Sequence, residues 1–176
     1  MNRRRLWGVA LLLTLGVVSL GAVERLRIVP LIQEKEVLVS LEIAEGYTDE
    51  VREMIASGLR TTFTYEIELR MVVVGWVDRT IATALISITD DYDNLTRRHT
   101  LSRAVDGRID ESIVTDDEEV VRTWLTKVTR VPLCATAELE PNREYYVRVS
   151  ARKRPQRSFP LAWSALSGQA NFTFIP

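Results

Sequence analysis

The chain has 176 residues, 46% of them hydrophobic and 27% charged, and its formal net charge is −1. This length suits one domain with its own hydrophobic core. The balanced charge argues against a nucleic-acid-binding protein, because such proteins carry clustered positive charge. Cys134 is the only cysteine, so the chain cannot form an internal disulfide. Because Cys134 lies in an apolar segment, we expect a buried and unreactive thiol.

The first 22 residues are predicted to be a signal peptide or an N-terminal membrane anchor. The basic segment Arg3–Arg5 precedes the uncharged segment Leu6–Val23, and small residues lie near its end. Ser19 and Gly21 suit cleavage after Gly21, and cleavage after Ala22 fits as well. An uncleaved anchor is the alternative, because the apolar segment approaches the length of a bilayer span. Both interpretations place the domain in the periplasm or at the outer face of the inner membrane.

A single antiparallel β domain is predicted for residues 36–176, preceded by a connector at residues 24–35. Residues 37–44 alternate apolar and polar side chains, which predicts the first strand. Thr48 and two following acids suit the start of a helix, where an oxygen acceptor and negative charge are favoured. The helix is expected to turn one stripe toward the core. The stripe consists of Val51, Ile55 and Leu59.

The segment from Thr62 to Trp76 shows the strongest strand pattern in the chain. Apolar side chains at every second position predict a strand with one buried face. We expect the buried face to hold Phe63, Tyr65, Ile67, Leu69 and Met71. The polar face holds Glu66, Glu68 and Arg70. A turn at residues 77–79 and a second extended segment at residues 80–92 complete a long hairpin.

The remaining segments continue this antiparallel pattern. Strands are expected at residues 95–104 and 108–114, joined by an Asp106-Gly107 hairpin turn. Residues 115–118 resemble a capping box that starts a helix extending to Lys127. Further strands are expected at residues 133–139, 144–154 and 169–175. The fold class is therefore mainly β (α+β), an antiparallel sandwich or partly open barrel with two short helices.

Three segments carry a family resemblance. They are the strand Phe63–Arg70 that ends near Trp76, the strand Glu144–Ala151, and Trp163-Ser164 before the aromatic last strand. Together, over about residues 37–174, they resemble a family of uncharacterised exported bacterial proteins, a domain of unknown function. The resemblance implies a periplasmic or membrane-associated protein, often encoded near sensor-kinase systems. It implies no activity and no functional residue.

The residues with chemical potential are better explained by structure than by catalysis. His99 is the only histidine, and neither a serine elbow nor a cysteine partner accompanies it, so we expect an exposed structural side chain. Asp90, Asp91 and Asp93 fail the spacing of a calcium loop and suit a turn. The acids at residues 116–119 suit a helix start. We therefore expect no catalytic, metal or cofactor site.

One basic segment is a candidate contact surface for a partner or a membrane. It contains Arg152, Lys153, Arg154 and Arg157. Four positive charges in six residues can attract acidic lipid headgroups or an acidic protein surface. A solvated loop is the alternative interpretation, since most charged segments are solvated.

These patterns predict a non-catalytic envelope module that binds a protein partner, for example the outer domain of a membrane sensor. A β scaffold offers strand edges that a partner strand can extend. The alternative is a carrier that holds an apolar or lipid-like ligand inside the barrel or sandwich. An enzyme is not expected, because no catalytic constellation is present. Nucleic acid is not an expected partner.

The first prediction concerns export. Because basic, apolar and small residues follow one another in the order of a signal peptide, the mature protein should begin near Ala22 or Val23. Sequencing the amino terminus of the protein isolated from its native envelope checks this. An intact Met1 on protein from the cytosolic fraction would contradict it.

Overall fold

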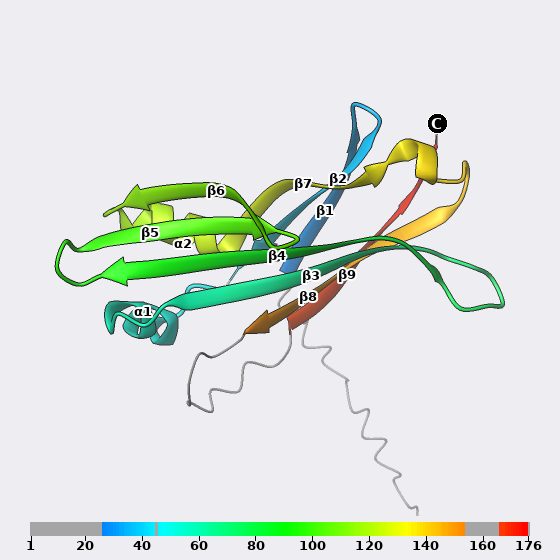
Figure 1. Ribbon diagram of the computed structural model, residues 1–176. Helices are drawn as coiled ribbons and strands as arrows, with labels where there is room; N and C mark the ends of the chain where they lie inside the picture. Colours follow the sequence, from blue (N-terminus) through cyan, green and yellow to red (C-terminus); the bar gives the residue numbers. More distant parts are fainter. Residues whose placement is uncertain (1–25, 45, 154–165, 176) are drawn as a thin grey trace, which may run out of the picture.

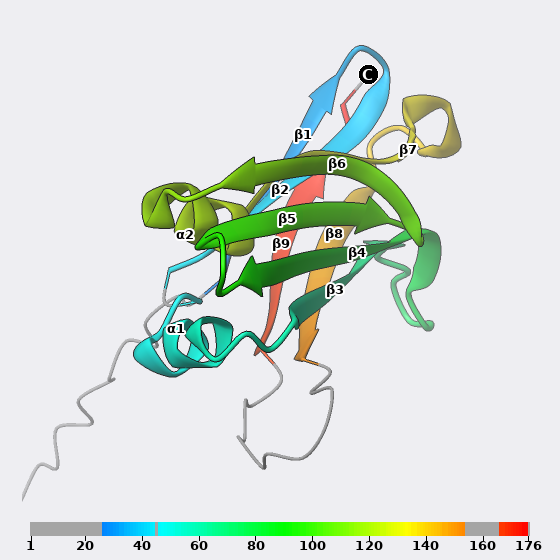
Figure 2. The same ribbon diagram turned by 60° about the vertical axis from the view of Figure 1, so that its left-hand side comes forward.

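The computed structural model describes residues 26–44, 46–153 and 166–175. Two antiparallel sheets pack as a mainly β sandwich with two short helices, which confirms the predicted fold class (Figures 1 and 2). The elements are β1 (Leu26–Gln33), β2 (Glu36–Ile43), α1 (Asp49–Ala56), β3 (Thr61–Met71), β4 (Arg79–Asp93), β5 (Arg98–Val105), β6 (Arg108–Thr115), α2 (Glu118–Thr126), β7 (Lys127–Ala135), the 3-10 turn η1 (Thr136–Glu138), β8 (Glu144–Lys153) and β9 (Leu166–Thr173). One sheet has the strand order β6-β5-β4-β3-β8-β9 and the other β1-β2-β7.

Strand β3 lies in the middle of the larger sheet. It pairs with β4 from Thr61 to Met71 and with β8 from Phe63 to Met71. Every second side chain of β3 is buried, with Ile67 and Leu69 fully inaccessible to solvent. The buried set is Phe63, Tyr65, Ile67, Leu69 and Met71. The predicted register of β3 is therefore confirmed, and Glu68 and Arg70 lie on its other, half-buried face.

The core lies between the two sheets, and both helices contribute to it. Val51 and Ile55 of α1 and Leu125 of α2 are buried in the same cluster as the β3 side chains. The Tyr65 hydroxyl donates a hydrogen bond of 3.2 Å to the Leu125 carbonyl. Carbonyls in the last turn of a helix lack helical partners, so this bond satisfies one and ties α2 to the larger sheet. Burial raises the pKa of Tyr65, so its hydroxyl stays a donor.

The helix boundaries confirm one predicted cap and shift another. The Thr48 side chain accepts a hydrogen bond from the Val51 amide, as expected for the start of α1. The second helix is capped by Asp117, whose side chain accepts from the Glu119 amide, and not by a box starting at Thr115. The prediction that Leu59 faces the core is wrong, because α1 ends at Ala56 and Leu59 is 51% exposed.

The β5–β6 turn has the predicted hairpin geometry. Asp106 and Gly107 have φ angles of 49° and 80°, which a two-residue hairpin turn requires of its central pair. Asp106 also binds β4, since its carboxylate accepts from the Leu85 amide at 2.9 Å and its own amide donates to the Leu85 carbonyl. The turn therefore fixes the position of the β5–β6 hairpin against β4.

The fold begins earlier than the sequence indicated. Residues 26–33, expected to belong to a connector, form β1 and pair with β2 along its whole length. Their pattern is hard to recognise because Val29 and Leu31 are both more than 40% exposed and Pro30 interrupts them. β1 also packs next to β9, where the Leu26 and Ile28 side chains lie over Gly168. β1 thereby joins the edges of the two sheets.

Two later strands also differ from their predicted bounds. β7 occupies Lys127–Ala135, ahead of the predicted residues 133–139, and it follows α2 without a loop. Its register against β2 shifts twice, and it forms a sheet edge, where Pro132 is tolerated. β9 begins at Leu166 rather than residue 169. Within the described ranges, no helix is long and apolar enough to cross a membrane.

The register of β3 predicts opposite responses to two neighbouring substitutions. Leu69→Ala should lower the free energy of unfolding by about 2–5 kcal/mol, because it leaves a cavity in the core. Glu68→Ala should lower it by less than about 1 kcal/mol, because ion pairs of partly exposed side chains contribute little. Denaturant unfolding of both variants measures the difference. A larger loss for Glu68→Ala would contradict the register.

Candidate functional site

The loop between β3 and β4 exposes three apolar side chains within four consecutive residues. Val74, Trp76 and Val77 have exposed fractions of 96%, 82% and 73%. Single exposed apolar residues are normal, whereas adjacent ones that include a tryptophan indicate an interaction site. We call residues 72–78 the apolar loop. It lies at the end of β3 that is remote from α1 (Figure 1).

The backbone of the apolar loop is held in a tight turn. The Trp76 amide donates to the Val73 carbonyl at 3.1 Å, and Gly75 has a φ of 76°. This combination describes a four-residue turn whose third position needs glycine. The Val72 amide donates to the Glu144 carbonyl at 2.9 Å and so joins the loop to the start of β8.

Asp78 holds the base of the apolar loop. One carboxylate oxygen accepts from the Val73 amide at 3.2 Å, and the other accepts from the Tyr146 hydroxyl at 2.9 Å. The Asp78 carbonyl accepts from the Arg70 guanidinium at 2.9 Å. The bonds from Val73 and Tyr146 keep the pKa of the Asp78 carboxyl below its usual value. The apolar side chains are thus displayed on a braced scaffold.

The charges around the base of the apolar loop pair with one another. Arg79 lies 2.9 Å and Arg143 3.4 Å from the Glu140 carboxylate. Arg70 and Arg148 both lie within 4.0 Å of the Glu68 carboxylate. Acids therefore neutralise the basic side chains next to the loop, and no positive patch surrounds Trp76.

The strand edges are less suitable for binding a partner strand. The β6 edge carries Arg108, Asp110 and Glu111, and charged edge residues discourage pairing. The β9 edge is covered by β1, whose side chains meet Gly168. The β7 edge contains Pro132, which cannot donate a backbone hydrogen bond.

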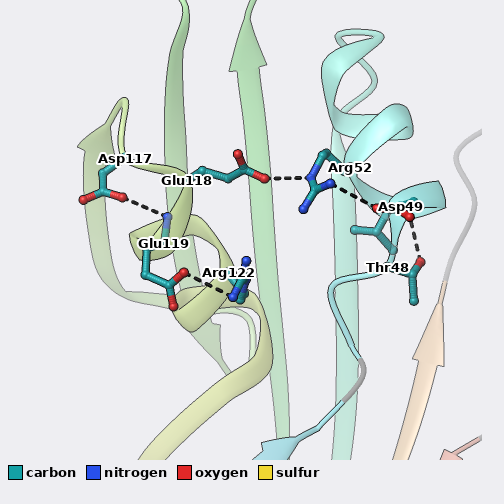
Figure 3. A network of polar contacts seen from close by, with 8 residues as sticks. Thr48, Asp49, Arg52, Asp117, Glu118, Glu119 and Arg122 are labelled. Carbon is teal, nitrogen blue, oxygen red and sulfur yellow. Dashed lines mark hydrogen bonds and ion pairs between the residues drawn. The ribbon is translucent and has the colours of Figure 1, made fainter.

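A polar cleft of about 570 Å³ lies at the opposite end of β3. α1, the β4–β5 turn and the start of α2 form its walls. Arg52 of α1 contacts Glu118 of α2 at 2.7 Å and also Asp49 at 3.0 Å (Figure 3). The Arg52 guanidinium lies 5.6 Å from the centre of the Tyr47 ring. The two helices are therefore joined by an ion pair beside the cleft.

His99 lines this cleft, and the prediction that it is exposed is wrong. Its side chain is 14% exposed, and Nδ1 lies 3.0 and 3.1 Å from the two carboxylate oxygens of Asp90. The Tyr92 ring packs against the imidazole with 4.5 Å between ring centres. Burial raises the pKa of the fully buried Asp90 carboxyl, and the hydrogen bond to His99 opposes that rise.

The pairing of Asp90 with His99 corrects the interpretation of Asp90 as a turn residue. Asp90 continues the buried alternation of Ile86 and Ile88 on β4, a signal that the sequence did contain. The missing information was the register of β4 against β5, which places Tyr92 opposite His99. Asp93 does form the predicted turn, since its carboxylate accepts from the Leu95 amide at 2.8 Å.

The predicted basic segment is only partly visible. Arg152 and Lys153 are the last two residues of β8, and Arg154 and Arg157 lie outside the described residues. Arg152 and Lys153 lie at one end of β8, whereas the apolar loop adjoins the other end, where Met71 pairs with Tyr145. Cys134 on β7 is half-buried, and burial raises the pKa of its thiol to about 11, with Glu138 adding to the rise. The thiol therefore stays protonated and unreactive.

These features define an antiparallel β-sandwich domain with an apolar loop at one end and a polar cleft at the other. No group of three or more His, Cys, Asp and Glu side chains in the described part of the chain could hold a metal ion. The chain belongs to DUF4390, a family described as a domain of unknown function, whose model matches residues 21–169. This confirms the resemblance to an uncharacterised domain family. No curated protein and no solved structure matches the chain.

The brace at Asp78 predicts a pH-dependent change in the apolar loop. A carboxyl with a lowered pKa in the folded state contributes stability above its usual value of 3.8, and this contribution is lost as the pH falls through the lowered pKa. The amide proton resonance of Val73 should therefore shift with a midpoint below pH 3.8 in an NMR titration. In Asp78→Asn this transition should vanish. A midpoint at or above 3.8 would contradict the brace.

Proposed function

We propose that this protein is an exported cell-envelope module, in the periplasm or at the outer face of the inner membrane, that binds a protein partner without catalysis. The observation that carries the proposal is the apolar loop, which presents Val74, Trp76 and Val77 to solvent on a braced turn. Tryptophan is among the residues that contribute most to protein–protein affinity, and a braced loop loses little entropy on binding.

A protein pocket fits the apolar loop better than a lipid surface does. Binding to an anionic membrane needs Lys or Arg side chains that are free to meet headgroups. Arg79 and Arg143 next to the loop are paired with Glu140, and Arg70 is paired with Glu68. The loop also lies away from β1 in both views (Figures 1 and 2).

Filling such a pocket contributes favourably to binding. Full burial of an exposed Val or larger apolar side chain contributes about 1.5–3 kcal/mol. Three such side chains contribute about 4.5–9 kcal/mol, from which an association cost of about 4–15 kcal/mol is subtracted. We therefore propose a moderate, specific interaction in which Trp76 is the anchor.

The carrier function is the less supported alternative. It requires a ligand space between the sheets, yet Tyr65, Tyr145 and Leu125 belong to one continuous buried cluster there. The polar cleft beside α1 lies at the edge of the sandwich and is lined by charged side chains. The basic residues Arg152 and Lys153, with Arg154 and Arg157, stay a candidate second contact surface for the partner or the membrane.

Site-specific photo-crosslinking in the native envelope tests this proposal. A benzophenone side chain replaces Val77 in one variant and Leu95 in a control, because Leu95 is 95% exposed on the β4–β5 turn. We expect a discrete protein adduct from position 77 and none from position 95. A probe at Val77 should lose its adduct when Trp76→Ala is added, since a binding anchor contributes about 2 kcal/mol or more.

Three outcomes would contradict the proposal. They are adducts to lipid alone from position 77, the same adducts from positions 77 and 95, and an adduct from position 77 that Trp76→Ala leaves unchanged. Circular dichroism of each variant verifies folding. Because the replaced side chains lie in solvent, surface substitution should leave the fold intact.

A further inference from the structure

We propose that the polar cleft beside His99 binds a small zwitterion that carries both a carboxylate and an amino group, of the amino-acid or short-peptide class. This inference is independent of the partner-binding function, because the cleft and the apolar loop lie at opposite ends of β3 (Figure 1). It is carried by the orientation of His99 and by two opposite charges without protein partners.

The contact between Asp90 and His99 determines which imidazole nitrogen is available to a ligand in the cleft. The buried carboxylate lies against Nδ1, so Nδ1 carries the hydrogen and donates it. Nε2 forms no hydrogen bond with any residue that the structure describes. The Tyr92 ring packs on the imidazole and supports its orientation. Nε2 is thus the ring nitrogen available to a polar group of a ligand.

A buried carboxylate under a cleft-lining histidine is not explained by stability alone. Asp90 is fully removed from solvent, and desolvating a carboxylate is costly even when it is paired. Asp90 lies behind the cleft-lining His99 and orients its ring. We take this arrangement as one that serves a ligand.

Two unpaired charges of opposite sign line the same cleft. Arg97 and Asp116 form no ion pair within the described part of the chain, whereas Arg52 and Glu118 neutralise each other. A carboxylate suits Arg97, whose planar guanidinium binds two oxygens at once. An ammonium group suits Asp116 as acceptor. Nε2 of His99 is available to a polar group of the same ligand. The unpaired Asp116 disfavours a phosphate, which it would repel.

The rest of the cleft suits a ligand with a modest apolar part. Ile55 and Ala56 of α1 and the Tyr92 ring supply apolar wall. The volume of about 570 Å³ lies within the range of small-molecule sites, about 300–1,000 Å³. An aliphatic amino acid or a dipeptide therefore fits the cleft in charge, polarity and size.

NMR of the imidazole tests the proposal directly, because His99 is the only histidine and its ring signals need no assignment by mutation. The full mature chain is titrated with L-leucine, N-acetyl-L-leucine, which lacks the ammonium, and L-leucinamide, which lacks the carboxylate. We expect L-leucine to shift the Nε2 resonance saturably. Each derivative should bind at least about tenfold more weakly, since a charge-assisted hydrogen bond contributes about 1.5–3 kcal/mol.

Two conservative variants assign the charges within the cleft. Arg97→Gln should remove the preference for L-leucine over L-leucinamide. Asp116→Asn should remove the preference for L-leucine over N-acetyl-L-leucine. Both side chains are exposed, so the fold should persist. Trp76→Ala should leave all three titrations unchanged, which separates a failure here from a failure of partner binding. No saturable shift with any probe, or equal affinity for all three, would overturn the proposal.

Discussion

The alternation of β3 is the constraint on which the rest of the structure depends. Strand side chains point to opposite faces in turn, so a slip of one residue would bury Glu66 and Glu68 and expose Ile67 and Leu69. With the register fixed, β4 and β8 take their places on either side. The two candidate sites lie at the two ends of β3. The apolar loop follows Met71, and the cleft lies near the end that begins at Thr61.

Both candidate sites run against the forces that stabilise the fold. Trp76 exposes apolar surface to water, although burying that surface would be favourable. Asp90 is buried, although a carboxylate is best solvated in water. In each case the surrounding structure compensates. Asp78 and Tyr146 hold the apolar loop in shape, and His99 supplies the hydrogen-bonding partner of Asp90. Such local conflict with folding is expected where a surface serves a binding function.

Features encoded by near neighbours in the chain were predictable, and features that depend on pairing were not. Alternation identified the buried face of β3, and Asp106-Gly107 specified the turn between β5 and β6, because both signals span a few residues. The contact of Asp90 with His99 requires the register of β4 against β5. The contact of Asp78 with Tyr146 joins residues that are 68 positions apart. The exposed Val29 and Leu31 concealed β1 because only tertiary pairing makes it a strand.

The length of β3 places the two ends of the molecule far apart. Eleven residues of strand span about 36 Å, several times the screening distance of about 8 Å at physiological ionic strength. β3 is hydrogen-bonded on both sides along its length. On the two proposals above, a partner at the apolar loop and a ligand in the cleft would be held at a separation that this strand sets.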